Sequence, residues 1–313
     1  MNQNLIELGS HALKKAALNE EAKAYVLNNP LVFQTLKKAA DRYIGGETLE
    51  ETLAKVKVEN GRGYKSSIEF MGENVSTEQE ARRATDEFVR IAQQIAQQSL
   101  YSTVSLDLSH VGLALSRALG LANLKRILDA ARPANTEVII SAEGANLTDD
   151  VISTYLAVAL EYGNVSITLQ AYLHRSQDDF QELVKQPGRI RLVKGAFDTP
   201  SHLALPRGND LDERYLEFLD QLLSTGHACS IATHHDKIQQ EARKLITLHG
   251  PHRQSYEFES LYGIQSELLA TLKAEGHPAK VYFVYGEEWY LYLCNRLAEY
   301  PLNLFRALDD IVS

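Results

Sequence analysis

The sequence predicts an α/β protein whose main body is a (β/α)8 barrel of the TIM type, with a helical N-terminal segment. Short β-rich runs alternate with longer stretches whose apolar residues recur every three or four positions. Strands that alternate with helices of ten or more residues pair in parallel, and eight such units close into a barrel. The length of 313 residues suits a barrel, which commonly needs about 250 residues, and a modest extra segment. An open, doubly wound sheet is the alternative.

The elements are justified in chain order. A helical segment is expected over roughly residues 4–58, so we place an N-terminal helical segment at 1–60 and the barrel at 61–313. Helices such as 76–98 and 212–226 begin at Ser, Thr or Asp, as capped helices do. Eight strands are predicted at SSIEFM (66–71), STVSLDL (102–108), EVIISA (137–142), VSITLQAYL (165–173), RIRLVKG (189–195), ACSIA (228–232), SYEFESL (255–261) and KVYFVYG (280–286).

Composition excludes several classes of protein. Hydrophobic residues make up 44% of the chain and charged residues 23%, as in folded soluble proteins. A formal net charge of −9 argues against a nucleic-acid partner, because such binding relies on clustered Lys and Arg. The sequence shows no signal-peptide core and no membrane-spanning run, so we expect a cytoplasmic protein. Cys229 and Cys294 are too few for a disulfide framework, which agrees with a reducing compartment.

Polar residues gather at the predicted strand ends, where a barrel of this type carries its chemistry. The positions of Arg191 and Lys194 differ by three, an odd number, and successive strand residues face opposite sides. At most one of the two therefore faces the barrel interior while the strand continues. The set comprises Glu69, Glu73, Asp107, Glu143, Gln170, Tyr172, Arg191, Lys194, Thr233, His234, Glu257, Glu259, Tyr282 and Tyr285.

Three general chemistries can be weighed from these residues. A metal-dependent hydrolase is disfavoured, because His234 and His235 are adjacent and neighbouring strand residues face opposite ways. A Schiff-base aldolase would use a buried Lys at a strand end, and Lys194 qualifies by position. The stretch NGRGYKSS lacks the third glycine of a dinucleotide fingerprint and precedes a strand, so it is neither that motif nor a phosphate loop.

Four sequence blocks stand out: LQAYLHR (169–175), RLVKGAF (191–197), IATHHD with YEFESLYGI, and VYFVYGEEWYLYLCNRLAEYP. In this order and at these separations, they resemble the flavin domain of the proline dehydrogenase family in its short bacterial form. The resemblance runs from about residue 40 to the C-terminus. It implies a distorted barrel whose last helix lies over a non-covalent FAD, and oxidation of proline to a pyrroline carboxylate.

The resemblance also implies roles for individual residues. Leu261 is similar to a residue near the substrate ring, and Tyr282 and Tyr292 to tyrosines that line the substrate pocket. Arg296 and Glu299 match the end of the helix motif, where an Arg can grip a carboxylate and a Glu can hold that Arg. Residues 292, 296 and 299 fall on one helix face. The positions that resemble flavin-contacting residues are Gln170, Arg191, Lys194, Gly195, Thr233 and His234.

Four positions depart from the family pattern. Asn295 stands where the motif has the first of two arginines, and Asp107 where the second strand has a Lys. Ser141 replaces an Asp and Glu259 replaces a Gln. These changes make the pocket more negative and weaken its hold on a carboxylate, since each charge-assisted hydrogen bond is worth about 1.5–3 kcal/mol.

Two functional hypotheses follow from these departures. One is ordinary oxidation of L-proline or a close cyclic amine or imino acid. The other is oxidation of an amine whose carboxylate is missing, masked or differently placed, with Asp107 or Glu259 meeting its ammonium group. A non-catalytic flavin-binding relative is a third alternative. The resemblance implies a quinone or another electron acceptor, and the acidic chain allows at most peripheral membrane contact.

Overall fold

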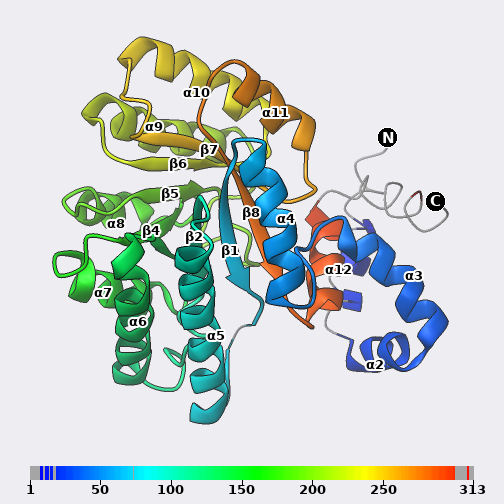
Figure 1. Ribbon diagram of the computed structural model, residues 1–313. Helices are drawn as coiled ribbons and strands as arrows, with labels where there is room; N and C mark the ends of the chain where they lie inside the picture. Colours follow the sequence, from blue (N-terminus) through cyan, green and yellow to red (C-terminus); the bar gives the residue numbers. More distant parts are fainter. Residues whose placement is uncertain are drawn as a thin grey trace.

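The computed structural model describes residues 8–9, 11–13, 15–16, 19–72, 74–299 and 309, with only the backbone at 299. Its eight parallel strands form a closed barrel in which β8 pairs with β1 (Figure 1). This confirms the predicted barrel and excludes the open sheet. The strands are β1 (Lys65–Phe70), β2 (Ser102–Leu106), β3 (Val138–Ile140), β4 (Val165–Gln170), β5 (Ile190–Val193), β6 (Cys229–Ala232), β7 (Tyr256–Leu261) and β8 (Ala279–Tyr285).

Helices follow the strands as the periodicity predicts, and part of the helical prediction over 4–58 lies outside the described residues. Asn29 caps a helix that begins at Pro30, so the N-terminal segment is broken there. Thr77 and Glu80 form a reciprocal capping box. The helices are α2 (Glu20–Asn28), α3 (Pro30–Asp41), α4 (Leu49–Gly61), α5 (Glu78–Gln97), α6 (Arg117–Ala131), α7 (Thr148–Ala159), α8 (Ser176–Leu183), α9 (Asn209–Thr225), α10 (Asp236–His249), α11 (Ser266–Ala274) and α12 (Trp289–Glu299), with the short 3-10 helix η1 (Arg132–Ala134) after α6.

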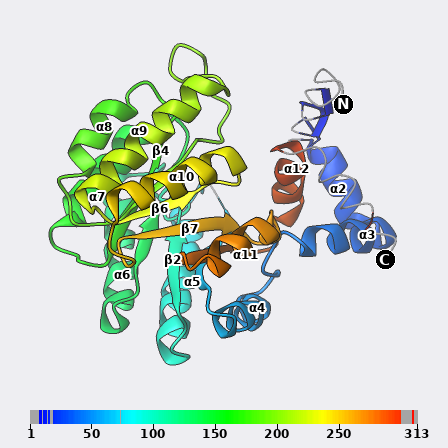
Figure 2. The ribbon, with the colours of Figure 1, turned by 90° about the horizontal axis from the view of Figure 1, so that it is seen from above.

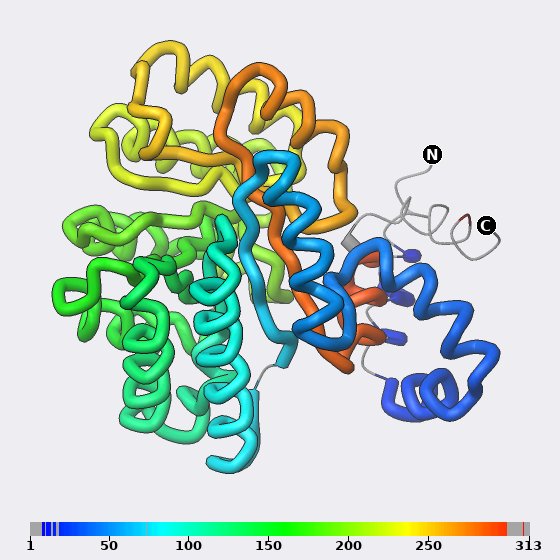
Figure 3. The backbone as a smooth tube through the Cα atoms, in the orientation of Figure 1, coloured from blue at the N-terminus to red at the C-terminus, as the bar shows by residue number. Residues whose placement is uncertain are grey.

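The barrel departs from the regular pattern where it closes. The helix after β8 would ordinarily cover the seam between β8 and β1, but here α4 contacts both of these strands. Helix α12 instead contacts α3, and the two lie side by side at one edge of the molecule (Figures 2 and 3). Helix α4 of the N-terminal segment thus covers the outside of the barrel at the seam. The last helix, α12, lies instead near the C-terminal strand ends.

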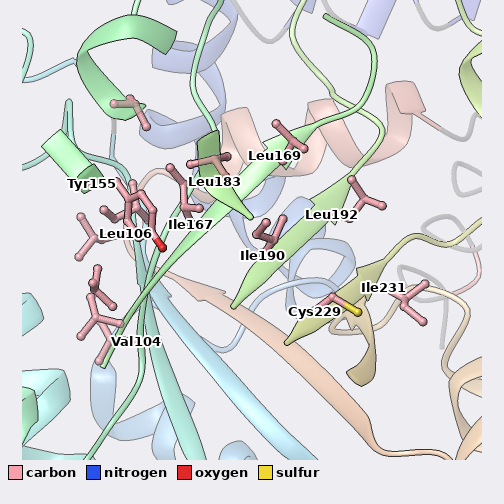
Figure 4. Close-up of a cluster of buried hydrophobic side chains, with 14 of the residues drawn as sticks. Val104, Leu106, Tyr155, Ile167, Leu169, Leu183, Ile190, Leu192, Cys229 and Ile231 are labelled. Carbon is pink, nitrogen blue, oxygen red and sulfur yellow. The ribbon is translucent and has the colours of Figure 1, made fainter. Parts of the chain in front are cut away.

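The outward-facing strand positions are apolar and form the main hydrophobic core under the helices. Figure 4 shows part of this layer, with Val104 from β2, Ile167 from β4, Ile190 from β5 and Ile231 from β6. All four are fully buried. A second apolar cluster joins α2, α3 and α12 to the C-terminal ends of β1, β7 and β8. Burial of apolar surface at about 25 cal/mol per Å² therefore holds both the barrel and the displaced helix.

The inward-facing positions are mostly polar, whereas the interior of such barrels is usually filled with branched aliphatic side chains. Near the N-terminal ends of the strands lies the lower charge cluster, defined as Lys65, Glu137, Arg189, Glu257 and Lys280. Lys65 Nζ is 2.9 Å from Glu137 Oε2 and 3.5 Å from Glu257 Oε2. These contacts join strands that are not neighbours, so they pass through the interior. Burial opposes ionisation of Glu137, but the surrounding cations lower its pKa to about 2.

Candidate active site

A second polar group lies in the barrel nearer the C-terminal strand ends. This Arg191 cluster consists of Glu69, Ser105, Ser141, Thr168, Arg191, Glu259 and Tyr282. Arg191 donates from Nε to Thr168 Oγ1 at 2.8 Å, from Nη1 to Ser105 Oγ at 3.0 Å and from Nη2 to Ser141 Oγ at 2.9 Å. Its guanidinium thus lies in the interior, bound to three neighbouring strands.

Tyr282 lies directly over this guanidinium. The Arg191 Cζ atom is 4.9 Å from the centre of the Tyr282 ring, which is within cation–π range. The Tyr282 hydroxyl donates to Glu69 Oε2 and also lies 3.2 Å from Ser105 Oγ. Burial raises the pKa of Tyr282 well above its usual value, and the nearby Glu69 charge adds to that rise. The phenol is therefore a neutral donor.

The charge of Arg191 is retained by its surroundings. Burial alone would lower the pKa of Arg191, but the Tyr282 oxygen and the Glu259 and Glu69 carboxylates raise it. Glu259 Oε1 is 3.5 Å from Arg191 Nη1, and Glu259 Oε2 is 2.7 Å from Lys280 Nζ. Glu259 is only 4% exposed. Its carboxylate is occupied by two interior cations, which argues against the hypothesis that Glu259 meets a substrate ammonium.

Lys194 points away from the barrel interior, so Arg191 is the one of these two residues that faces inward. Its Nζ atom contacts Asp212 of α9 and lies 2.8 Å from His235 Nδ1. Gly195 has a φ of +111°, and a Cβ built there would lie 2.2 Å from Tyr172 Cδ1. The close neighbour that requires glycine is thus the Tyr172 ring. A Schiff-base role for Lys194 is disfavoured, because its ammonium is paired with a carboxylate.

The other flavin-contact candidates lie at the ends of β4 and β6. Gln170 is buried, and its Nε2 donates to the Glu143 carbonyl at 2.8 Å. The Thr233 hydroxyl accepts from the His235 amide at 3.1 Å. His234 Nε2 accepts from the Leu261 amide at 3.0 Å, so a neutral imidazole carries its proton on Nδ1. Burial and the Arg296 charge lower the pKa of His234 to about 4.

Helix α12 approaches the strand ends from the β6 to β8 side. The Arg296 Cζ atom lies 5.0 Å from the centre of the Tyr292 ring, so these two residues share a face. The Arg296 charge contributes to the low pKa of His234, so Arg296 lies near the end of β6. Asn295 is half-buried beside them. The Glu299 side chain, like Glu73, lies outside the described residues.

The two remaining substrate-site candidates lie at the ends of other strands. Asp107 follows β2 directly and is half-buried. Leu261, the last residue of β7, packs against the second apolar cluster together with Tyr292. Through its amide it is tied to His234. Leu261 thus connects the end of β6 with the surface that α12 covers.

Sequence reasoning missed Ser105, Thr168 and Lys280. Each occupies an inward position in a strand whose alternate residues are apolar, as in STVSL, VSITLQ and KVYFVY. Strands of a parallel barrel are usually apolar on both faces, so this alternation was an available signal for a polar interior.

His110, in the turn after β2, is a further buried titratable residue near the strand ends. Its ring stacks on Phe70 with centres 5.2 Å apart, and it meets the edge of Phe88. A Cβ at Gly72, where φ is +153°, would lie 2.2 Å from His110 Nε2. The imidazole is 7% exposed. Burial lowers the pKa of His110 to about 4, so the folded protein holds this residue neutral.

We expect this burial to make the protein less stable in acid. Between pH 6.5 and about pH 4 an unfolded His binds a proton that folded His110 does not, so stability falls as the pH drops through this range. The full contribution is about 3 kcal/mol. Urea unfolding at pH 7 and near pH 4 should show a smaller pH-dependent loss for His110→Phe than for the wild type. The exposed His202→Gln variant serves as control, and equal losses in all three proteins would contradict the prediction.

The fold and the site together define a class: a (β/α)8-barrel enzyme with a polar interior and functional groups at the C-terminal strand ends. A family model for proline dehydrogenase matches residues 52–301. Proline dehydrogenase 2 of Bacillus subtilis strain 168 is 34% identical over 273 residues, which cover 87% of this chain and 90% of that protein. Proline dehydrogenase of Deinococcus radiodurans is 29% identical over 295 residues, covering 93% and 94%. The chain therefore belongs to the proline dehydrogenase family and is an oxidoreductase.

Solved structures agree at the level of the fold. Proline utilization A (PutA) from Bdellovibrio bacteriovorus gives a TM-score of 0.82 at 17% identity, over 94% of this chain and 36% of that longer one. A PutA mutant from Bradyrhizobium japonicum gives 0.70 at 21% identity, over 83% and 30%. The family model and the curated relatives confirm the family resemblance drawn from the four sequence blocks.

The described part of the chain lacks two features. None of its helices has both the length and the apolar character needed to cross a bilayer. Within the same residues, no group of three His, Cys, Asp or Glu side chains is arranged to hold a metal ion.

Proposed function

We propose that the protein binds FAD at the C-terminal end of its barrel and oxidises L-proline, or a closely related cyclic amine, to a pyrroline-type imine. The observation that carries the proposal is the meeting of two elements at one site. Tyr282 lies over a buried, charged Arg191, and its ring packs in the second apolar cluster together with α12. Tyr292 and Arg296 share a face of that helix. Family membership supports the same reaction.

The chemistry of the donor set fits a flavin. Gln170 on β4, Arg191 on β5 and His234, two residues after the end of β6, supply an amide, a guanidinium and a neutral imidazole. Thr233, Lys194 and Gly195 flank them. When bound, FAD would supply the acceptor for a hydride from the substrate carbon next to nitrogen. Arg191 contributes a fixed positive charge beneath Tyr282, and a buried cation of this kind stabilises negative charge that develops nearby.

The substrate side is formed by the other residues. Tyr282 and Tyr292 present aromatic faces that can enclose a small saturated ring. Arg296 can bind a carboxylate with two parallel hydrogen bonds, and Glu299, from its place in the helix motif, would steady that Arg. Leu261 supplies apolar contact at the end of β7.

A second candidate differs only in the substrate. Asp107, directly after β2, and Asn295, on α12, are half-buried, whereas Glu259 and Ser141 are bound within the barrel. An amide and a carboxylate in these places favour an amine whose acidic group is missing, masked or placed elsewhere. Electrons would then pass to a quinone or another acceptor by contact at the protein surface.

The test is a set of anaerobic titrations of the purified yellow protein. L-proline, pyrrolidine and L-prolinamide share one ring and differ in the carboxylate. We expect at least one of them to bleach the flavin absorption band. Bleaching by L-proline at the lowest concentration supports ordinary proline oxidation, and bleaching mainly by the other two supports the second candidate. A protein that holds no FAD, or whose FAD no such amine reduces, would refute the proposal.

A further inference from the structure

The carboxylate of Glu69 receives two hydroxyl groups from other strands. The Tyr282 hydroxyl, on β8, donates to Glu69 Oε2. The Ser141 hydroxyl, directly after β3, donates to the same oxygen at 2.9 Å. Glu69 lies on β1, so its carboxylate links the neighbouring strand β8 to the end of β3, which is two strands away in the other direction. Two hydroxyl donors on one oxygen are what an ionised carboxylate accepts.

Arg191 sets the direction of its own hydrogen bonds in this group, whereas either hydroxyl can donate in the 3.1 Å contact between Ser105 Oγ and Ser141 Oγ. A guanidinium has only donors, so Ser105 and Ser141 must accept from it. The Ser141 proton is then free to go to Glu69, and the shorter of the two Tyr282 contacts is also with Glu69. Glu69 is therefore the negative end of two chains of hydrogen bonds, one through Ser141 from Arg191 and one directly from Tyr282.

The Tyr282 ring separates the ionic interior from the displaced helix. One side of the ring lies over Arg191. The ring is also part of the second apolar cluster, together with Trp289 and Leu293 of α12. Besides the cation–π contact with Arg191, the hydroxyl contact with Glu69 and a weaker one with Ser105 orient the ring on β8.

We propose that Glu69 is the positioning residue of the site: it fixes the Tyr282 ring between Arg191 and α12. Residue 141 is a serine and contributes only a hydroxyl group here, so the carboxylate that Tyr282 contacts comes from Glu69 on β1. It touches neither the helix nor the reacting atoms through this contact, and it acts through Tyr282. The inference rests on the proposed function for its effect on substrate, whereas the contact itself can be tested without FAD.

The test combines two measurements on Glu69→Gln, Tyr282→Phe and the double variant. In urea unfolding of the FAD-free protein, the two single changes should be non-additive, with the double variant losing less stability than the sum of the two single losses. In amine oxidation, Glu69→Gln should lower kcat/KM by about 10- to 100-fold, the loss expected for one charge-assisted hydrogen bond. The rise in KM should exceed the fall in kcat, because Glu69 takes no part in bond changes. Glu69→Asp, which keeps the charge, should lie between Gln and wild type.

The same strand offers a matched control. Tyr285, also on β8, donates to Glu87 Oε1 of α5 at 2.6 Å on the outer side of the barrel. Glu87→Gln should affect unfolding but leave KM and kcat unchanged. Additive unfolding effects, or a wild-type KM in Glu69→Gln, would overturn the inference while the proposed function stands. A wild-type protein that oxidises none of the amines would instead refute the proposed function, and the unfolding cycle would still decide the contact.

Discussion

Replacing Lys280 with Met should lower the free energy of unfolding by about 3–5 kcal/mol, the usual cost of removing one partner from a buried ion pair. The Lys280 ammonium is completely buried, 2.5 Å from Glu257 Oε1 and 2.7 Å from Glu259 Oε2. Methionine has a similar shape but leaves two buried carboxylates without their nearest cation. Urea unfolding at neutral pH measures the loss.

Two further variants test the cause of that loss. Lys185 pairs with Glu182 at 2.7 Å, but both side chains are more than half exposed. Lys185→Met should therefore cost no more than about 1 kcal/mol. Adding Glu259→Gln to Lys280→Met should recover part of the stability, because it removes one of the uncompensated charges. A Lys280→Met protein as stable as Lys185→Met would show that the lower charge cluster does not depend on this cation.

Restoring a second arginine to α12 should strengthen the binding of L-proline. In Asn295→Arg the new guanidinium would sit next to Arg296 on the half-buried part of the helix. A charge-assisted hydrogen bond to the substrate carboxylate is worth about 1.5–3 kcal/mol. We therefore expect kcat/KM for L-proline to rise about 10- to 100-fold, mainly through a lower KM, since each tenfold change corresponds to about 1.4 kcal/mol.

Steady-state kinetics with L-proline and pyrrolidine distinguish charge from size. Pyrrolidine has no carboxylate, so its kcat/KM should not rise in Asn295→Arg. Asn295→Gln lengthens the side chain without adding charge and should not improve L-proline oxidation. A folded, FAD-containing Asn295→Arg protein with an unchanged KM for L-proline would mean that the carboxylate binds away from this position.

The barrel could be predicted because its signals are local. The alternation of strands and helices can be read from short stretches of sequence. That Arg191 and Lys194 point to opposite sides follows from the geometry of a single strand. The shared face of Tyr292 and Arg296 likewise needs only the helical period. These features depend on neighbouring residues, so the sequence alone was sufficient for them.

The partners of the polar residues could not be predicted in the same way. Lys194 contacts Asp212 and His235 from two later elements, and Glu259 contacts Lys280 on the next strand. Each pairing depends on how separate elements are placed in three dimensions. The position of α4 at the barrel seam could not be predicted for the same reason. Nothing in the sequence of a helix before β1 indicates that it will cover the seam in place of the helix after β8.

The position of α4 has a consequence for folding during synthesis. Leu49, Leu53 and Val56 are made before any strand of the barrel, but β8, one of the two strands that they cover, is the last of the eight to be made. Contacts between such distant segments are slow to form, because the intervening chain must first be ordered. Until then an apolar helix face and two unpaired strand edges stay exposed to other molecules. The closing step of this barrel is therefore the stage at which aggregation competes most directly with folding.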